Sequence, residues 1–314
     1  MKIEISEVGP RDGLQNCKAI MPTEAKKAWI KAEYEAGVRE IEVGSFVPAK
    51  LLPQLADTAE IVTYARTLPG LVVAVLVPNL RGAQGAVEAG AHKITLPLSV
   101  SETHSLKNLR RTHEQVLSEA RAIAELITAE APDTHFEGSL STAFGCTLEG
   151  AIPLSQILRL AEGLADAGCA EIGISDTTGY AEPASVRALI RAVRGAVGAD
   201  KVHGIHLHNT RGLGLANALA AFEEGLTTFD SSLGGLGGCP FAPGASGNIV
   251  TEDLVFMFEG MGVDTGIDLD ALLKVREIVA AALPDEPLYG FTPDAGLPLG
   301  FGRGVTQAGQ PDAA

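Results

Sequence analysis

Short apolar stretches rich in β-branched residues recur along the chain and alternate with longer segments of helical character. Such alternation is typical of parallel βα units. The pattern predicts eight strands, over residues 2–8, 40–44, 72–77, 92–98, 135–141, 171–176, 203–208 and 227–232. Eight strands of this kind suggest a closed barrel, an α/β fold of the (β/α)8 or TIM-barrel class.

The segments between the predicted strands carry start and stop signals of helices. Residues 22–38 begin with proline and threonine and reach Gly37 at their end. Comparable segments end in "EAGA", "DAGC" and "EEGL", a weak internal repeat that supports the barrel. The main alternative is an open doubly wound sheet. Its dinucleotide-binding version is excluded, because no GxGxxG follows the first strand.

The chain after the eighth strand divides into two parts. Residues 248–262 and 268–283 are amphipathic and are expected to form additional C-terminal helices. Residues 284–314 are rich in Gly and Pro with little periodicity. We therefore expect a barrel domain with C-terminal helices over residues 1–283, followed over residues 284–314 by a C-terminal arm that is ordered at first and frayed at its end.

Composition narrows the class of protein. The longest apolar run, Leu71–Val77, is much shorter than the roughly 20 residues that a membrane span needs. The N-terminus shows no export signal, so a cytoplasmic location is expected. The formal charge of -15 opposes binding to nucleic acid or to an anionic membrane, although a small anionic ligand could bind at a local basic spot.

Candidate metal ligands stand at the predicted strand ends. His206 and His208 are two residues apart on one strand, so both rings face the same side, whereas His203 is in the opposite phase. Asp12 and Asn248 add oxygen ligands at ends that a barrel brings to the same mouth, and mixed N/O ligation suits Mg²⁺ or Mn²⁺. The alternative is that the histidines are hydrogen-bonded core residues and Asp12 an ordinary turn aspartate.

Two further features suggest chemistry at this mouth. Arg11 offers a fork of donors that cannot lose its proton, a good partner for negative charge developing on an oxygen. The glycine-rich segment from Gly234 to Gly247 could form a lid, or simply a flexible connection. Cys239 within it could transfer protons if its pKa is suitable. The default interpretation of each cysteine, in the absence of any CxxC pair, is a small buried apolar residue.

The motifs resemble those of the 3-hydroxy-3-methylglutaryl-CoA (HMG-CoA) lyase family of metal-dependent barrels. They run in the family order from the first strand to the helix after the eighth: "GPRDGLQN", "IEVGSFVPAKLLPQL", "LSTAFGCTLEG", "SDTTG", "HLHNTRGLGLAN" and "GLGGCPFAPGASGNIVTEDLVFMFEGMG". The glycine-cysteine-proline stretch is especially specific.

The resemblance implies roles for individual residues. The implied ligands of a divalent metal ion, Mg²⁺ or Mn²⁺, are Asp12, His206, His208 and Asn248. The implied catalytic residues are Arg11, Cys239, Glu42, Asp176 and His206, with Arg11 stabilising an enolate and Cys239 acting in proton transfer. Substrate contacts are expected from Arg11, Gln15, Lys18 and Ser45.

The implied reaction is a retro-Claisen cleavage of HMG-CoA to acetyl-CoA and acetoacetate, as in leucine degradation and ketone-body formation. The implied partner is the acyl-CoA thioester, and the implied assembly is a homo-oligomer, a dimer or larger. Asn209, Arg211 and Cys17 depart from the family pattern. An extra arginine near the mouth could favour another 3-hydroxy-acyl-CoA, such as citramalyl-CoA, cleaved to acetyl-CoA and pyruvate. A non-catalytic barrel that only binds a CoA ester is the remaining alternative.

Overall fold

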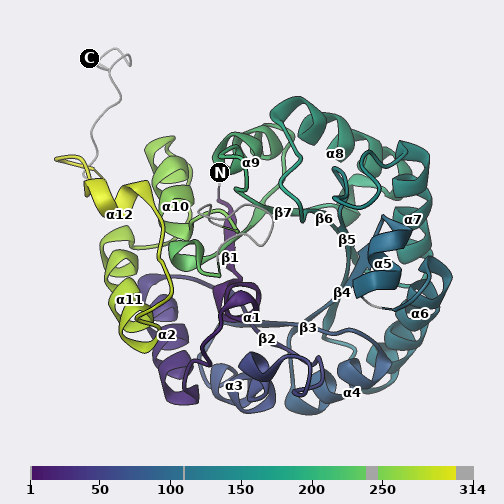
Figure 1. Cartoon of the computed structure of the whole chain (residues 1–314), viewed down its shortest axis with the longest axis horizontal. Coiled ribbons are helices and arrows are strands. Elements are labelled where there is room, and N and C mark those ends of the chain that lie inside the picture. The colour runs from purple at the N-terminus through teal and green to yellow at the C-terminus, as the bar shows by residue number, and fades with distance from the viewer. Residues whose placement is uncertain (1, 109, 238–246, 302–314) are drawn as a thin grey trace.

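The computed structural model describes residues 2–108, 110–237 and 247–301. Its eight strands pair in parallel and close into a barrel in the order β1 to β8, with β8 pairing back onto β1 (Figure 1). The strands are β1 (Glu4–Glu7), β2 (Glu40–Ser45), β3 (Val72–Leu76), β4 (Lys93–Ser99), β5 (His135–Ser141), β6 (Glu171–Asp176), β7 (Gly204–Leu207) and β8 (Thr228–Ser231). The predicted TIM barrel is confirmed.

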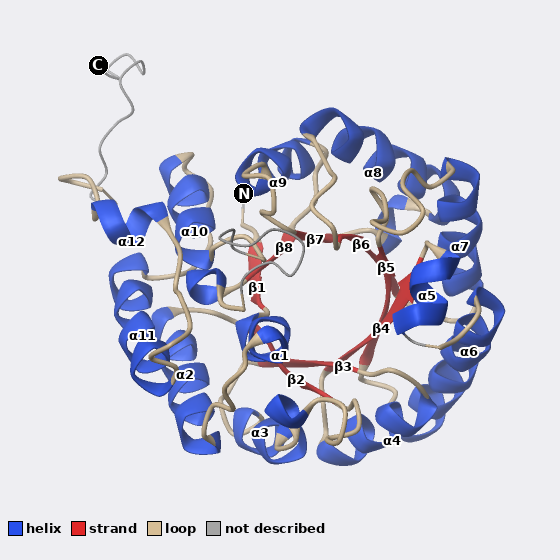
Figure 2. Cartoon of the chain, viewed as in Figure 1, coloured by secondary structure: helices blue, strands red, loops and turns tan. Residues whose placement is uncertain are grey.

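Helices surround the strands as an outer ring (Figure 2). The ring contains α2 (Thr23–Ala36), α3 (Thr58–Ala65), α4 (Leu80–Ala89), α6 (His113–Glu130), α7 (Leu154–Asp166), α8 (Pro183–Val197), α9 (Gly214–Glu223) and α10 (Thr251–Gly260). Shorter helical segments lie in the connections: η1 (Gly9–Gly13), α1 (Leu14–Asn16), η2 (Pro53–Leu55), α5 (Glu102–Asn108), η3 (Ala199–Lys201) and η4 (Leu233–Gly235). Within the described ranges, no helix is both long and apolar enough to cross a membrane.

The C-terminal region adds helices outside the ring. The predicted helix over 248–262 is α10, the outer helix that follows β8, while the one over 268–283 is α11 (Leu269–Ala282), which packs against α2. Beyond it, α12 (Phe291–Ala295) packs against α10. The predicted frayed end falls on residues 302–314, which lie outside the described residues. The division of the chain at residue 283 stays a prediction.

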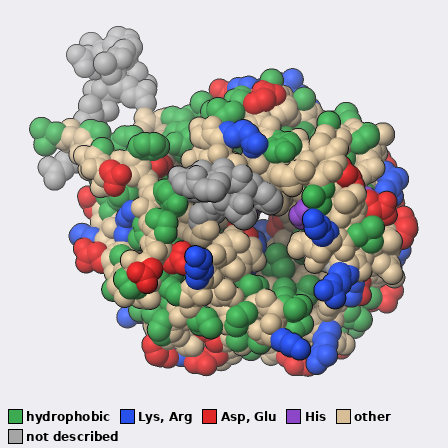
Figure 3. All heavy atoms as spheres, viewed as in Figure 1, with side chains coloured by type: hydrophobic (Ala, Val, Ile, Leu, Met, Phe, Trp, Pro, Cys, Tyr) green, Lys and Arg blue, Asp and Glu red, His purple; other side chains and the backbone are tan. Residues whose placement is uncertain are grey.

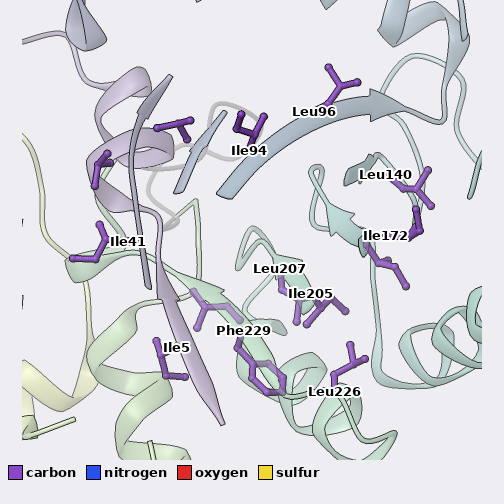
Figure 4. Packing of buried hydrophobic residues seen from close by; sticks show 14 of the residues in the cluster. Ile5, Ile41, Ile94, Leu96, Leu140, Ile172, Ile205, Leu207, Leu226 and Phe229 are labelled. Atoms are coloured by element: carbon purple, nitrogen blue, oxygen red, sulfur yellow. The ribbon is translucent and has the colours of Figure 1, made fainter. Parts of the chain in front are cut away.

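The apolar core lies between the barrel and its helices. Alternate strand residues such as Ile41, Ile94 and Ile205 belong to the buried apolar cluster, and Figure 4 shows these three together with other members of the cluster. Because successive side chains point to opposite faces of a strand, their neighbours point into the barrel. Those neighbours are largely polar, and they include Glu40, Glu42, Lys93, Glu137 and Asp230, which line the internal cavities.

Lys93 organises the lower part of the barrel interior. Its ammonium lies 3.2 Å from Glu40, 2.9 Å from Glu137 and 3.6 Å from Glu171. Burial opposes the ammonium charge, but these carboxylates, Glu137 first, keep the pKa of Lys93 well above its ordinary value. Burial also raises the pKa of Glu137 to about 7. The inside of this barrel is therefore held by charge pairing rather than by apolar layers.

Gly37, at the end of α2, packs against the connection between α10 and α11, and this contact predicts that position 37 requires glycine. Gly37 ends α2 at φ +110°, and a Cβ there would lie 2.2 Å from the carbonyl oxygen of Gly266. Gly70 also has a positive φ, of +77°, but faces open space. Gly70→Ala should cost about 1–2 kcal/mol from backbone strain alone. Gly37→Ala should cost clearly more, as measured by urea unfolding, and equal losses in the two variants would contradict the close packing.

Candidate active site

The turn after β1 carries the first site residues. Gly9–Gly13 form one turn of π-helix, in which the Val8 carbonyl accepts hydrogen bonds from the backbone of Arg11 and Asp12. Gly9 allows this close turn, because a Cβ there would lie 2.5 Å from Glu7 Oε1 and 2.9 Å from the Trp29 ring. The turn thereby presents Arg11 and Asp12 as neighbouring buried side chains at the barrel mouth.

Arg11 joins two carboxylates. Its Nε donates to Glu42 Oε2 at 2.5 Å, and its Nη1 donates to Asp12 Oδ1. Burial works against these charges, but the two carboxylates raise the pKa of Arg11 further. Burial alone would likewise raise the pKa of Asp12, yet the Arg11 guanidinium together with His208 and His206 holds it well below its ordinary value. Asp12 is therefore an ionised carboxylate, the form that a metal ion requires.

His206 and His208 bring their rings to Asp12, as the strand phase predicts. The two Nε2 atoms lie 3.1 Å apart, and His208 Nε2 lies 3.8 Å from Asp12 Oδ2. One ligand atom from each of the three residues falls within 4.8 Å of the others. His203 instead is exposed and contacts the Asp200 carbonyl through Nε2 at 2.8 Å. These positions agree with the expected ligand pair and with a separate place for His203.

Asn248 completes the oxygen side of the cluster. Its Nδ2 donates to Asp12 Oδ2 at 2.7 Å, and a backbone bridge joins Asn248 to His208. Among the described residues, its buried Oδ1 has no hydrogen-bond partner. Two imidazoles, a carboxylate and an unsatisfied amide oxygen fit a divalent cation, because each can offer it a nitrogen or oxygen lone pair. The described residues therefore fit the predicted metal site.

Asp230 holds one of the ligands in place, and the sequence analysis missed it. Its Oδ2 lies 3.0 Å from His206 Nδ1, which leaves Nε2 of that ring directed at the cluster. Burial lowers the pKa of His206, but the hydrogen bond to Asp230 and the charges of Asp230 and Asp12 together outweigh it, so the net pKa is raised. Asp230 is opposite His206 in the β7–β8 pairing. The sequence could have indicated this role, because Asp230 is a carboxylate at an inward position of β8 and metal-binding histidines usually pair with such a group.

A cavity of about 730 Å³ opens at the site. Its upper walls include hydroxyl groups of Ser141, Ser175 and Thr177, and its rim includes Lys107, Arg110 and Arg111. Figure 3 shows a hollow in the centre of this face, with basic side chains along one side of it. Arg111 is ion-paired with Glu119 at 2.8 Å, whereas Lys107 and Arg110 are exposed. The strongly acidic chain thus has a local basic rim, which suits an anionic ligand.

The other predicted site residues divide into two groups. Gln15 and Glu42 line the cavity, and Gln15 Nε2 donates to Asp12 Oδ1 at 2.6 Å. Lys18 is exposed and Ser45 is buried, and neither lines the cavity. The Ser45 hydroxyl accepts from the Val47 backbone at 3.3 Å. Their roles in substrate binding stay predictions.

Asp176 accepts hydrogen bonds from the backbone of the loop after β6. Its two oxygens accept the backbone N–H groups of Tyr180 and Ala181, at 2.8 and 3.1 Å. Burial raises the pKa of Asp176 in spite of these bonds. Its carboxylate is buried beside the histidines, whose charges act on it, but it is not part of the cavity wall. A catalytic role for Asp176 stays a prediction.

Arg211 does not face the cavity. Its Nη1 donates to the carbonyls of Thr178 and Gly179, at 3.1 and 2.7 Å, and its guanidinium lies over the Tyr180 ring. Asn209 Oδ1 accepts from the Gly214 backbone at the start of α9. Arg211 therefore fastens the loop after β7 to the loop after β6 rather than adding a charge to the pocket, whereas the Asn209 bond lies within the loop after β7.

The described cysteines follow the default interpretation. Cys17, Cys146 and Cys169 are free and buried, and burial raises the pKa of Cys17 and of Cys169 to about 12. Cys239, the predicted proton-transfer residue, and most of the predicted lid lie outside the described residues.

The geometry predicts how individual variants change metal binding. His206→Ala and His208→Ala should each weaken Mn²⁺ binding strongly, as measured by isothermal titration calorimetry, whereas His203→Ala should not. Asp230→Asn should weaken it about 10- to 100-fold, because outer hydrogen bonds orient the ligating ring. Equal losses from all three histidine variants would contradict the assigned ligand pair, and unchanged affinity in Asp230→Asn would remove the orienting role.

Comparison with known proteins places the chain in a family. Residues 2–279 match the family described as HMGL-like. The chain is 42% identical to the mitochondrial hydroxymethylglutaryl-CoA lyase of Arabidopsis thaliana over 90% of its own length, and spans 59% of that protein. It is 39% identical to hydroxymethylglutaryl-CoA lyase YngG of Bacillus subtilis, over 92% of this chain and 97% of that one.

Solved structures agree. An HMG-CoA lyase from Acinetobacter baumannii, in complex with coenzyme A and 3-methylmalate, superposes with a TM-score of 0.87 at 42% identity, covering 94% of this chain and 95% of that chain. An HMG-CoA lyase from Pseudomonas aeruginosa gives a TM-score of 0.88 at 34% identity, covering 94% and 97%. These matches confirm the resemblance inferred from the motifs, and the chain belongs to the HMGL-like family.

Proposed function

We propose that this chain is a divalent-metal-dependent lyase that cleaves HMG-CoA to acetyl-CoA and acetoacetate. The observation that carries the proposal is the buried cluster of Asp12, His206 and His208 with the Arg11 guanidinium beside it, at the wall of a large cavity. Relatives at about 40% identity over nearly the whole chain are named for this activity. A divalent cation bound by Asp12, His206, His208 and Asn248 supplies a Lewis acid that acidifies the tertiary hydroxyl of the acyl group.

Glu42 is the carboxylate best placed to take the hydroxyl proton. It lines the cavity, and the bond to Arg11 fixes its position. Burial raises the pKa of Glu42, which makes it a stronger base than an exposed glutamate. Asp176 is less suitable, because both of its oxygens already accept backbone N–H groups.

Arg11 meets the negative charge that develops on the thioester oxygen as the carbon-carbon bond breaks. Glu42 and Asp12 occupy its Nε and Nη1, and Nη2 makes no hydrogen bond to the described residues. A guanidinium whose orientation is already fixed stabilises such an enolate without reorganising. The proposal that Cys239 then protonates the enolate carbon comes from the sequence alone.

The basic rim provides a site for the coenzyme A portion of the substrate. Exposed Lys107 and Arg110 stand at the opening of the cavity and can pair with phosphate groups, while the acyl end reaches Arg11 and the metal ligands. Arg211 is the residue that suggested citramalyl-CoA as an alternative substrate. It is bonded to backbone carbonyls outside the cavity, so HMG-CoA remains the preferred substrate. The complete ligand set weighs against a barrel that only binds CoA esters.

Finer properties belong to the same proposal. We infer that the physiological metal is Mg²⁺ or Mn²⁺, that the enzyme serves leucine degradation and ketone-body formation, and that it works in the cytoplasm as a dimer or larger homo-oligomer. Neither nucleic acid nor a membrane is expected as a partner, because the chain is strongly acidic apart from the rim of its cavity.

The proposed activity predicts a metal requirement and a substrate preference. Protein stripped with chelator should release no acetyl-CoA from HMG-CoA, and Mg²⁺ or Mn²⁺ should restore release. In a panel of 3-hydroxy-acyl-CoA esters, HMG-CoA should have the highest kcat/KM. Full activity in metal-free buffer would remove the central claim, whereas a higher kcat/KM for citramalyl-CoA would change only the acyl group.

The role of Arg11 predicts a specific kinetic change. Arg11→Met should lower kcat by about 10²–10³, the typical cost of losing one donor to an oxyanion, with a much smaller change in KM. Steady-state kinetics with saturating Mg²⁺ would measure it. A change confined to KM would reassign Arg11 to ground-state binding of the substrate.

The basic rim predicts the opposite pattern. The double variant Lys107→Met/Arg110→Met should raise KM for the CoA ester and leave kcat nearly unchanged, because phosphate contacts bind substrate and transition state equally. Lys31→Met, at an exposed position of α2 outside the cavity, is the matched control for loss of positive charge. An unchanged KM in the double variant would exclude the rim as the coenzyme A site.

A further inference from the structure

Glu7 is a buried carboxylate that joins three segments around the site. At the end of β1, its Oε1 accepts the backbone N–H groups of Gly9 and Leu233, at 2.8 and 2.9 Å. Its Oε2 accepts the Thr251 hydroxyl at 2.7 Å. One side chain thus connects the Arg11–Asp12 turn, the start of η4 and the start of α10, but it does not line the cavity.

Glu33 is a second buried carboxyl, and nothing in the proposed reaction uses it. It lies on α2 with 0% of its surface exposed, and neither of its oxygens makes a normal hydrogen bond to any residue that the structure describes. The indole nitrogen of Trp29, one helical turn earlier, also lacks one. An ionised carboxylate left in this state would cost many kcal/mol, so such a group takes up a proton instead.

The neighbours of Glu33 show where that proton points. Glu7 and Trp29 both lie close to Gly9, because a Cβ there would be 2.5 Å from Glu7 Oε1 and 2.9 Å from the Trp29 ring. Trp29 precedes Glu33 by one turn of α2, and the Glu33 carboxyl interacts with Glu7, with the Trp29 indole and, more weakly, with Glu252. Burial raises the pKa of Glu33 well above its ordinary value, and the Glu7 carboxylate raises it further. Burial raises the pKa of Glu7 too, but the Thr251 hydroxyl and the backbone N–H groups of Leu233 and Gly9 oppose it, so these three donors favour the negative charge on Glu7 rather than on Glu33.

We propose that Glu33 is an un-ionised carboxylic acid that donates its proton to the Glu7 carboxylate, so that the two share a single negative charge beneath the Arg11–Asp12 turn. The Trp29 N–H then donates to the remaining oxygen of Glu33. Glu33 is a positioning residue in this arrangement, because it acts on the site only through Glu7. The inference holds whichever acyl-CoA the cavity accepts.

One further charged group, Glu252, lies near the Glu7–Glu33 pair, and its charge is balanced by an arginine. Glu252 on α10 also faces the pair, accepts the Gly234 N–H and is ion-paired with Arg276 of α11 at 2.6 Å. Because Arg276 neutralises Glu252, the charge left to place is that of Glu7 and Glu33. Removing the last proton would put two like charges side by side in an apolar site and loosen what Glu7 holds.

The chain carries its own reporter for this proton. Trp29 is the only tryptophan in the sequence, and its indole faces Glu33. Its fluorescence in the full-length protein should change in one transition on the alkaline side of neutral pH. Glu33→Gln should abolish the transition, because the amide cannot ionise but can still donate to Glu7. Glu35→Gln, at an exposed position of the same helix, should keep it. A transition that persists in Glu33→Gln would overturn the proposal.

Infrared spectroscopy tests the proton directly. At pH 7 the wild type should show the carbonyl band of a buried un-ionised carboxylic acid, and the difference spectrum against Glu33→Gln should show its loss. Absence of a difference would mean that Glu33 is ionised. If Glu33→Leu folds, it should have a lower kcat than Glu33→Gln, because leucine offers no donor to Glu7. Equal kcat in the two would overturn the positioning role.

Stability against pH gives an independent check. An acid whose pKa is raised in the folded state holds a proton that the unfolded chain releases above pH 4.5, so stability falls as pH rises towards the folded pKa. Glu33→Gln removes one such proton. Above pH 4.5, the unfolding equilibrium constant of Glu33→Gln should therefore increase less steeply with pH than that of wild type, by a factor of up to about ten per pH unit. Parallel curves for wild type and Glu33→Gln would contradict a shared proton.

Discussion

The ion pairs of Arg11 fix the geometry on which the site depends. Glu42 and Asp12 are both buried, and without a cation between them their charges would repel each other and Asp230. Desolvation makes buried ion pairs weak contributors to stability, so the arrangement is better understood as serving position and charge than as stabilising the fold. With Arg11 in place, Asp12 stays ionised and presents Oδ2 to the histidines and to Asn248.

Buried carboxylates paired with a basic side chain also occupy the lower part of the barrel interior. A barrel of this class is usually filled by layers of branched apolar side chains. Here Lys93 and its carboxylates occupy the lower interior, and Asp230 lies between them and His206. Apolar packing is confined to the shell between strands and helices, where Ile41, Ile94 and their equivalents meet the helices. The interior is consequently free to be polar, and polarity is what the chemistry at the mouth requires.

The sequence predicts the features that follow from local periodicity. The eight strands, the C-terminal helices and the shared face of His206 and His208 depend on the spacing of residues two to four apart, and the structure contains each of them. The convergence of Asp12 and Asn248 follows from the barrel itself, since parallel closure gathers all strand ends at one mouth.

Other features depend on contacts that no local pattern contains. A glutamate on a helix, such as Glu33, has the same sequence signature whether it faces water or another carboxyl. Asp230 and Lys93 look like ordinary polar residues of short strands until the pairing shows which face they occupy. Arg211 illustrates the opposite error. Its position beside a site motif suggests a pocket residue, but its guanidinium donates hydrogen bonds to carbonyls of the neighbouring loop instead.

Closure of the ring by β1 and β8 has a consequence for how the protein is made. Asn248 and Thr251, which bond to Asp12 and Glu7, follow them by more than two hundred residues and therefore leave the ribosome much later. Contacts of such long range form late, because the chain between them must first be ordered. A nascent chain that stops short of Asn248 therefore has both histidines but not all four residues that fit a metal ion. The site is complete only after the segment that follows β8 has been made.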